Sequence, residues 1–220
     1  MLVYRFLSER WALDALRDRR LKLALIHELN DPFELLGVDL RDKRLRLAFQ
    51  QLKVQLSATR RMLCFSKQWH NPVLWSHYAD KHKGLALGFE VPPGSLQEIR
   101  YDLERVAPEP DWLLAPEALK LQHMNKFLAT KFRHWEYEAE VRQFFKLEER
   151  DPRTGHYFVE FSKDLKLAQV LIGPSSPLAP RDIFKIQSPS DAVEVIPSRL
   201  AFKSFQVVRN KLKAPAPQSV

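Results

Sequence analysis

The alternation of apolar and polar residues predicts strands and helices that follow one another along the chain. Stretches rich in β-branched and aromatic residues are typical of strands, and they occur at residues 2–6, 62–66, 85–91, 140–147, 157–161, 167–173, 192–196 and 204–208. These stretches are enough for one mixed or largely antiparallel sheet, or for a sheet split in two. With the helices between them, they predict an α+β fold.

Three helices are expected between the strands. The clearest spans residues 42–59, where Asp42 can cap the first turn and apolar side chains recur at helical spacing. The apolar side chains of that helix are Leu45, Phe49, Leu52 and Leu56. A second helix is expected from Pro116 to about residue 131, and a shorter one over residues 9–17. The second helix would direct three apolar side chains toward the core, Leu121, Met124 and Leu128.

Length and composition predict a single domain over residues 1–210, followed by a flexible tail over residues 211–220. The chain is 45% hydrophobic, which allows a sizeable core. Cys64 is the only cysteine, so no internal disulfide can form and a reducing cytoplasm is expected. Charged residues near the amino terminus, and the lack of a long uncharged run, predict a chain that is neither secreted nor membrane-spanning.

The formal net charge of +8 is distributed unevenly. Residues 1–63 carry 13 basic and 8 acidic side chains, a net of +5, and residues 199–213 carry 5 basic side chains and no acidic one. Residues 64–198 carry 17 basic and 19 acidic side chains, a net of −2. Basic ends attract polyanions because Lys and Arg that contact phosphates release condensed counterions into solution, although solubility alone explains the basic ends equally well. We expect a nucleic acid or another acidic partner, and no membrane.

Several common classes of active site are excluded because the sequence lacks their motifs. The chain has 6 glycines and no Gly-rich phosphate loop of the dinucleotide or Gly-Lys-Ser/Thr type, and the G-x-S-x-G elbow does not occur. No two histidines have the H-E-x-x-H spacing of a zinc-binding helix. His77, Asp80 and His82 are close enough in sequence to hold a metal, but such a group usually faces solvent, and we expect no metal.

The first segment with residues suited to a site runs from Asn30 to Glu34. Asn30 and Asp31 favour a turn, which Pro32 stiffens, and Phe33 can anchor it. The segment is therefore either a structural turn or part of a site.

The second such segment, residues 74–84, places aromatic and polar residues in front of a predicted strand. Trp75 and Tyr78 offer flat stacking faces, while His77 can exchange a proton near neutral pH. Gly84 permits a tight turn at the end of the segment. A ligand pocket and an aromatic turn that lines the core both explain this density.

The third segment comprises residues 134–142. If it is extended, Glu136, Glu138, Glu140 and Arg142 share one face of a strand. Like charges along one face repel unless a cation or ligand separates them. The acidic row therefore either meets a ligand or is neutralised by Arg142 and basic neighbours.

At these three segments the chain resembles the bacterial family catalogued as domain of unknown function 2971. The resemblance covers about residues 3–173 and rests on an ordered series of strings. They are Tyr4-Arg5-Phe6, Asn30-Asp31-Pro32-Phe33-Glu34, Cys64-Phe65-Ser66, Trp75-Ser76-His77-Tyr78-Ala79-Asp80 with His82-Lys83-Gly84, Trp135-x-Tyr137-Glu138-x-Glu140-x-Arg142 and Leu171-Ile172-Gly173. Leu74 and Val141 depart from the Met and Trp that are frequent in the family. Membership implies no activity.

A looser resemblance is to the layout of ADP-ribosyltransferases. A basic residue in the first strand, an aromatic-hydroxyl cluster in the middle and a glutamate that opens a later strand follow the order of that superfamily. The resemblance implies an enzyme of a bacterial toxin or phage-defence type with NAD as its substrate, and an antitoxin or defence partner. Cleavage of the nicotinamide bond builds positive charge on the ribose, which Glu140, or Glu138 in its place, would stabilise.

The same resemblance implies roles for residues elsewhere in the chain. Tyr78 would stack on the nicotinamide and Arg5 would pair with the pyrophosphate. Ser66 and His77 would hydrogen-bond to the ribose or the amide, and Arg142 would orient Glu140. The catalytic candidates are thus Glu140, Glu138, His77 and Tyr78. The substrate-binding candidates are Tyr4, Arg5, Asn30, Asp31, Ser66, Trp75 and Arg142.

Two alternatives use overlapping residues. A noncatalytic nucleotide or nucleic-acid binding or sensor module would use the basic ends and four stacking side chains, Trp75, Tyr78, Trp135 and Tyr137. A metal-dependent nuclease would require the convergence of Asp31, Glu34, His77, Asp80 and Glu140. The position of Glu140 discriminates between the first two hypotheses, because an enzyme requires Glu140 to face a pocket, whereas a binding module leaves it exposed or paired with Arg142.

Overall fold

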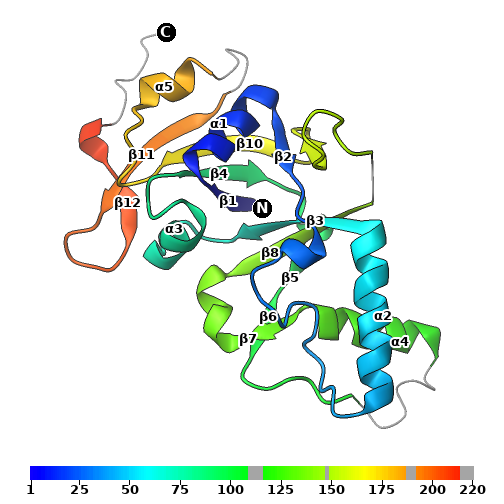
Figure 1. The fold of residues 1–220 in the computed structure, drawn as a ribbon. Coiled ribbons are helices and arrows are strands. Elements are labelled where there is room, and N and C mark those ends of the chain that lie inside the picture. Colours follow the sequence, from blue (N-terminus) through cyan, green and yellow to red (C-terminus); the bar gives the residue numbers. More distant parts are fainter. Residues whose placement is uncertain (109–115, 147–148, 187–191, 214–220) are drawn as a thin grey trace. The chain divides into compact units, whose positions relative to one another are not determined.

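A computed structural model describes residues 1–108, 116–146, 149–186 and 192–213. These residues confirm the predicted α+β fold class, with a mixed, largely antiparallel sheet (Figure 1). Contacts divide the chain into two compact units. Unit 1 comprises Met1–Lys22, Phe65–Pro93 and Phe158–Val220, and unit 2 comprises Leu23–Cys64 and Gly94–Tyr157. The expectation of a single domain over residues 1–210 stays a prediction.

The sheet of unit 1 has the strand order β12-β11-β10-β4-β1, with the end of β3 beside β1. Neighbouring strands are antiparallel, except that β10 and β11 are parallel. Its strands are β1 (Leu2–Leu7), β4 (Leu85–Glu90), β10 (Lys166–Ile172), β11 (Glu194–Leu200) and β12 (Val207–Arg209). β4 lies between β1 and β10 and is buried along its length except at Glu90, so it forms the centre of the core.

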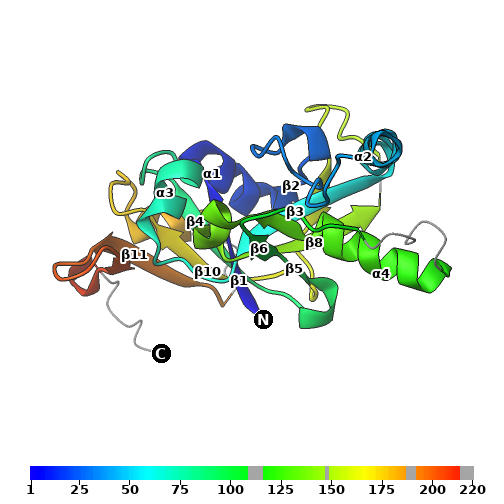
Figure 2. The same cartoon turned by 90° about the horizontal axis from the view of Figure 1, so that it is seen from below.

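Two helices of unit 1, α1 (Glu9–Asp18) and α3 (Pro72–Tyr78), lie on the same side of this sheet (Figure 2). Asn71 caps α3 by accepting a hydrogen bond from the Val73 N–H at 2.9 Å, and Pro72 occupies the first helical position, where its missing N–H costs nothing. The shorter elements of this unit are β2 (Arg20–Lys22), β9 (Phe158–Glu160), α5 (Pro180–Phe184) and η5 (Lys211–Lys213).

Unit 2 combines two longer helices with short strands. α2 (Lys43–Thr59) and α4 (Glu117–Leu128) pack through Phe49 and Phe127, whose ring centroids lie 5.9 Å apart. In its sheet, β8 (Glu140–Lys146) lies between β3 (Arg60–Ser66) and β5 (Gln97–Glu98). The last two residues of β3 belong to unit 1. The other elements are β6 (Arg100–Asp102), which is parallel to β7 (Thr130–Phe132), and the 3₁₀ helices η1 (Ile26–Glu28) and η4 (Arg133–Glu138). The short η2 (Pro93–Ser95) begins in unit 1 at Pro93 and continues in unit 2 from Gly94.

Most of the predicted elements are confirmed. α2 begins after Asp42, whose carboxylate accepts a hydrogen bond from the Arg44 N–H at 2.7 Å, and the predicted stripe is buried at Leu45 and Phe49. Each predicted strand has a counterpart, but the predicted strand at residues 204–208 overlaps β12 only at Val207 and Val208, because residues 204–206 belong to the connection between β11 and β12. Leu147, the side chain of Leu121 and the tail from residue 214 onward lie outside the described residues.

The predicted end of the second helix is wrong, and the condition that residues 134–142 are extended is not met. The second helix ends at Leu128 rather than near residue 131, because Thr130–Phe132 pairs with Arg100–Asp102 as a parallel strand. Residues 134–142 are not one extended segment, since η4 ends at Glu138 and Ala139 adopts a left-handed conformation with φ of 44°. The extended strand therefore starts only at Glu140.

Gly84 occupies a site in unit 1 where the backbone leaves no room for a side chain. A Cβ atom there would lie 2.1 Å from the Leu7 carbonyl oxygen and 3.0 Å from the Ala79 carbonyl oxygen. We expect Gly84→Ala to lower the free energy of unfolding by about 2 kcal/mol or more, because backbone atoms must move to relieve the overlap. Urea unfolding followed by circular dichroism measures this change.

Gly94→Ala is the matched control, since nothing lies within 4 Å of a Cβ atom at that position. It should leave the free energy of unfolding within about 0.5 kcal/mol of its original value. Equal stabilities for the two variants would contradict the close approach at Gly84.

Candidate functional site

Five charged side chains gather in the interior of unit 2, and we call them the ion cluster. Each of these residues exposes 6% of its surface or less, and they are Glu34, Lys131, Glu138, Glu140 and Arg142. They come from the turn that precedes α2, from β7, from η4 and from β8. Removing a charge from water costs several kcal/mol unless partners replace the lost hydration. The contacts within the cluster must therefore compensate one another.

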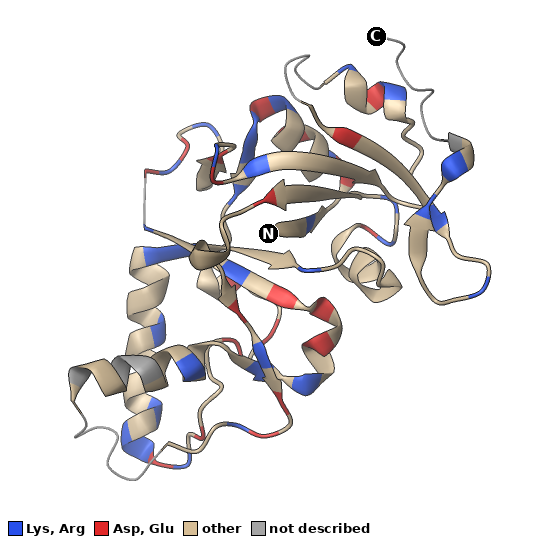
Figure 3. Ribbon diagram, turned by 180° about the vertical axis from the view of Figure 1, so that it is seen from behind, with Lys and Arg blue, Asp and Glu red and all other residues tan. Residues whose placement is uncertain are grey.

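The backbone around Ala139 brings the acidic residues of the cluster together. Glu138 ends η4, and the left-handed Ala139 turns the chain so that β8 can begin at Glu140. Alternate residues of a strand share a face, so Glu140 and Arg142 lie beside one another, as the sequence predicts. Acidic and basic positions follow closely along this part of the ribbon (Figure 3).

Lys131 lies among three carboxylates. Its Nζ donates hydrogen bonds to Glu138 Oε2 at 2.6 Å and to Glu140 Oε2 at 3.1 Å, and it lies 3.9 Å from Glu34 Oε2. The ammonium also stands 4.9 Å from the centroid of the Trp135 ring, within the range of a cation–π contact. Burial lowers the pKa of Lys131, but the three carboxylates outweigh burial and hold it above its usual value. Lys131 is therefore charged.

Arg142 joins Glu140 to Glu34. Its Nε donates to Glu140 Oε1 at 2.7 Å and its Nη2 donates to Glu140 Oε2 at 3.0 Å, which is the forked geometry of a strong ion pair. Its Nη1 lies 2.6 Å from Glu34 Oε1, an ion pair whose angle falls outside that of a hydrogen bond. One guanidinium thus links β8 to the turn before α2.

The turn that carries Glu34 is built by its own polar groups. Asp31 is buried, and its Oδ1 accepts a hydrogen bond from the Phe33 N–H at 2.9 Å, as in an Asx turn. Leu35 has a left-handed φ of 60°, and Lys53 on α2 donates from Nζ to the Glu34 carbonyl at 3.1 Å. Asn30 is exposed. These contacts favour the structural interpretation of this turn.

Tyr101 supports the cluster from β6. It pairs with Lys131 in the parallel register of β6 and β7, and its hydroxyl accepts a hydrogen bond from the Glu140 N–H at 2.7 Å. Burial raises the pKa of Tyr101 well above its usual value, so the hydroxyl stays protonated. The backbone and the side chain of Glu140 are therefore both held.

Both carboxylate oxygens of Glu140 are occupied. Burial raises its pKa, but the field and hydrogen bonds of Arg142, with Lys131 and a hydrogen bond from Cys64, lower the pKa of Glu140 to about 2. A carboxylate with this pKa is ionised at neutral pH and is a weak base. Because this pKa is below the usual 4.5, the group contributes stability above about pH 4.5 that is lost as the pH falls toward 2.

Trp75 lies in the core of unit 1. Its side chain is 0% exposed, its Nε1 donates to the Trp69 carbonyl at 2.6 Å, and its ring meets Phe6 edge-on at 5.1 Å. Packing therefore uses the faces that a ligand would need. This placement corrects the expectation that Trp75 binds a ligand by stacking.

The remaining predicted residues of unit 1 lie on β1, β3 and α3. Tyr4 and Ser66 are paired across β1 and β3, and the Tyr4 hydroxyl donates to Gln169 Oε1 at 3.2 Å. His77 and Tyr78 are adjacent on α3, with ring centroids 6.0 Å apart. Arg5 is half-buried on β1.

The predicted site residues are thus divided between the units. Unit 1 contains Tyr4, Arg5, Ser66, Trp75, His77 and Tyr78, whereas unit 2 contains Asn30, Asp31, Glu138, Glu140 and Arg142. The structure brings Glu138, Glu140 and Arg142 together. The convergence of Arg5, Tyr78 and Glu140 on one cavity stays a prediction.

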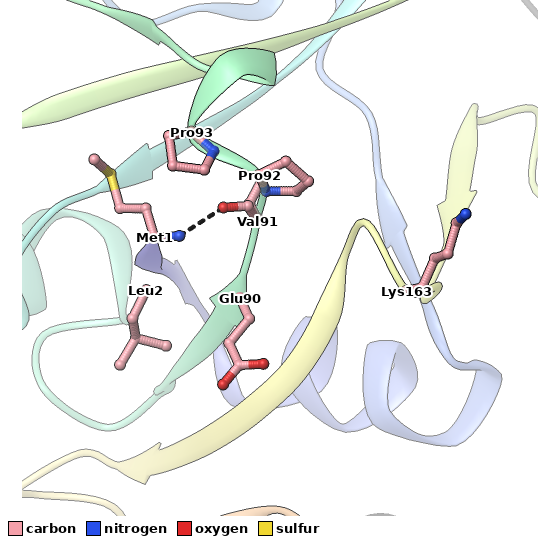
Figure 4. Close-up of a pocket in the computed structure, with 7 residues that line it drawn as sticks. All are labelled: Met1, Leu2, Glu90, Val91, Pro92, Pro93 and Lys163. Atoms are coloured by element: carbon pink, nitrogen blue, oxygen red, sulfur yellow. Dashed lines mark hydrogen bonds between the residues drawn. The ribbon is translucent and has the colours of Figure 1, made fainter.

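An open hollow of about 420 Å³ lies at the start of β1 in unit 1 (Figure 4). The ammonium group of Met1 donates to the Val91 carbonyl there at 2.7 Å. Its lining contains none of the predicted site residues and consists of Met1, Leu2, Glu90, Val91, Pro92, Pro93 and Lys163.

Metal-binding geometry was expected for the nuclease alternative. Over residues 1–108, 116–146, 149–186 and 192–213, no three His, Cys, Asp or Glu side chains are grouped so that they could hold a metal ion. The contacts of Glu34 and Glu140 show why: Lys131 and Arg142 occupy the positions that a cation would take.

A second candidate surface is the β11–β12 hairpin of unit 1, together with its connection, residues 201–206. The connection is closed by a hydrogen bond from the Ala201 N–H to the Gln206 carbonyl at 2.9 Å. Phe202 and Phe205 are 89% and 97% exposed, respectively. The Arg199 guanidinium carbon lies 4.4 Å from the centroid of the Phe202 ring.

From residue 199 onward the charges of this hairpin have one sign, since residues 199–213 contain no Asp and no Glu. Before that point, β11 begins with the acidic Glu194. Arg209 forms an ion pair with Glu194, at the start of β11. Lys203 lies between the two exposed phenylalanines and is itself exposed. Cations and aromatic rings are thus interleaved.

Sequence reasoning missed Lys131 and Tyr101 as members of the site. Lys131 was expected at the end of a helix, and an isolated lysine gives no signal of burial. The row of glutamates at residues 136–140 did indicate that a cation was needed, but not which one. The exposed phenylalanines of the hairpin were also missed, because residues 204–208 alone resemble an ordinary strand.

The chain matches no protein-family model, no curated protein and no solved structure. The resemblance to domain of unknown function 2971 therefore stays a prediction. Among the described residues, no helix has the length and apolar character needed to cross a membrane.

Replacement of Glu140 tests whether its role is structural. We expect Glu140→Gln to lower the free energy of unfolding by about 3 to 5 kcal/mol at pH 7, because Arg142 and Lys131 would remain buried without their shared partner. Urea unfolding measures the change.

Glu136→Gln is the matched control in the neighbouring 3₁₀ helix. Its carboxylate is exposed and lies 3.8 Å from Arg133, so the change should be below about 1 kcal/mol. If Glu140→Gln left stability unchanged or raised it, Glu140 would resemble a catalytic group that is held at a cost to folding, and the structural interpretation would be rejected.

Proposed function

We propose that the protein is a noncatalytic module that binds nucleic acid through the β11–β12 hairpin and the basic segment that follows it. The observation that carries the proposal is the exposed combination of Phe202, Phe205 and neighbouring cations on one hairpin. Aromatic rings beside Lys and Arg are the groups with which proteins bind nucleic acids without catalysis.

Electrostatics supports a polyanionic ligand. Residues 199–213 contribute 5 positive charges and no negative one. Each phosphate that these cations contact releases condensed counterions, which favours binding at low salt. Glu194 compensates Arg209, so the hairpin itself relies chiefly on Arg199 and Lys203.

The state of Glu140 supports a binding module over an NAD-cleaving enzyme. Stabilisation of an oxocarbenium requires a carboxylate whose negative charge is directed at the substrate. The charge of Glu140 is instead compensated by Arg142 and Lys131, and both of its oxygens accept hydrogen bonds. An ADP-ribosyltransferase-like reaction would have to release these contacts first.

Under this proposal the three predicted partner classes are ranked by chemistry. A nucleic acid supplies both phosphates for the cations and bases for the rings. An acidic protein supplies only the charges, and an antitoxin or defence partner would have to cover the exposed phenylalanines. The proposed place of action is the cytoplasm, which the single cysteine favours.

Fluorescence anisotropy with a labelled 20-nucleotide strand, titrated between about 50 and 200 mM KCl, tests the proposal. We expect the dissociation constant to rise steeply with salt, and Lys203→Glu to weaken binding and to reduce the slope of log K against log salt by about 1.

Lys163→Glu is the matched control, since it makes the same charge change on an exposed lysine of unit 1 outside the hairpin. It should have a smaller effect on affinity than Lys203→Glu. No binding at 50 mM KCl, or equal effects of the two variants, would reject the hairpin as a nucleic-acid site.

A further inference from the structure

We infer that the β11–β12 hairpin selects single strands, whose unpaired bases stack on Phe202 and Phe205. This inference rests on the proposed nucleic-acid function and adds the class of ligand. The inference requires stacking in addition to charge, because cations alone bind double and single strands alike.

The exposure of the two rings is the first argument. Burial of a phenylalanine side chain is favourable, yet Phe205 is 97% exposed and Phe202 is 89% exposed. They occupy the connection rather than the packed strands, where Val207 is fully buried. Large exposed apolar groups that gather at one place mark binding sites.

The hairpin holds the rings on a defined framework. β11 and β12 pair in the register Ser198–Arg209, Arg199–Val208 and Leu200–Val207, and the bond from Ala201 to Gln206 extends the pairing into the connection. Ser198 Oγ also donates to the Ile172 carbonyl, which ties β11 to β10. A ligand therefore meets a partly preorganised site, which lowers the entropic cost of binding.

Arg199 contacts one face of the Phe202 ring and leaves the other face for a base. Its guanidinium stacks over Phe202, and its Nη1 donates to the Leu200 carbonyl at 3.0 Å. Because Phe202 remains 89% exposed, its opposite face is open to a base. Arg199 can in turn meet a phosphate of the same strand, since a guanidinium both stacks and donates in its plane.

The spacing of charges disfavours a membrane. Lys203 and Ser204 separate the two rings, so insertion of both phenylalanines would carry a charged residue and a hydroxyl toward the hydrocarbon. A strand of nucleic acid accommodates this order, since each of its nucleotides offers one phosphate and one base. Duplexes fit poorly because their bases are already stacked on one another.

The test compares a 20-nucleotide single strand with the duplex of the same sequence by fluorescence anisotropy, on the full chain. We expect the single strand to bind more tightly at equal salt. Phe205→Ala should weaken single-strand binding at least about fivefold, because loss of one stacked base costs about 1 kcal/mol or more. The salt slope should stay constant, since phenylalanine releases no counterion.

Phe205→Trp and Phe184→Ala are the reference variants. Tryptophan keeps the stacking face and should retain single-strand affinity, while Phe184, an exposed residue of α5, should be replaceable without effect on binding. Thermal unfolding of each variant shows whether the fold is intact; Phe205→Ala should unfold as the original chain does, since its ring is almost fully exposed.

The failures of the two proposals are distinguishable. Equal binding of single strand and duplex, with loss on Lys203→Glu but not on Phe205→Ala, overturns the stacking inference and leaves the nucleic-acid function standing. No binding of either nucleic acid overturns both. Binding to vesicles of phosphatidylserine and phosphatidylcholine that depends on Phe205, without binding of oligonucleotides, assigns the hairpin to a lipid surface and also overturns both.

Discussion

The compensation of buried charge in unit 2 is the constraint on which the rest of that unit depends. Five acidic and basic side chains lie inside it with almost no access to water. The free-energy cost of burying these charges is offset only because Lys131 and Arg142 are shared among the three glutamates. The ion pairs therefore require fixed relative positions of four segments, which are β7, η4, β8 and the turn before α2. These shared ion pairs thus hold together segments that are more than a hundred residues apart in the sequence.

This constraint changes how the sequence motifs are interpreted. The strings that contain Glu34 and Glu140 are widely separated, and their polar residues suggest a reaction site. In the folded chain Arg142 joins the two strings through ion pairs. A series of acidic and basic residues can therefore mark a structural element, and a motif alone does not identify a catalyst. The proposed binding surface, in contrast, lies on unit 1 and uses residues outside those strings.

Local patterns predicted much of the fold, and nonlocal contacts account for the errors. The stripe at Leu45 and Phe49 and the cap at Asp42 are local signals, so α2 was predicted with nearly correct bounds. The left-handed Ala139 carries no such signal, because its conformation serves the cluster around it. The burial of Lys131 depends on glutamates from three other segments, which periodicity along the chain cannot show. The sequence did predict that Glu140 and Arg142 share a face, and it offered their pairing as the mark of a binding module.

The most direct test of this account is the ionisation of Glu140 itself. Carbon-13 NMR of the side-chain carboxyl carbons, assigned by comparison with Glu140→Gln, follows each glutamate as the pH is lowered. The account predicts that Glu140 stays ionised throughout the range in which exposed glutamates titrate, with a pKa near 2, or until the fold is lost. A carboxyl that takes up its proton at or above pH 4.5 would show that Arg142 and Lys131 do not hold it, and Glu140 would return as a candidate for catalysis.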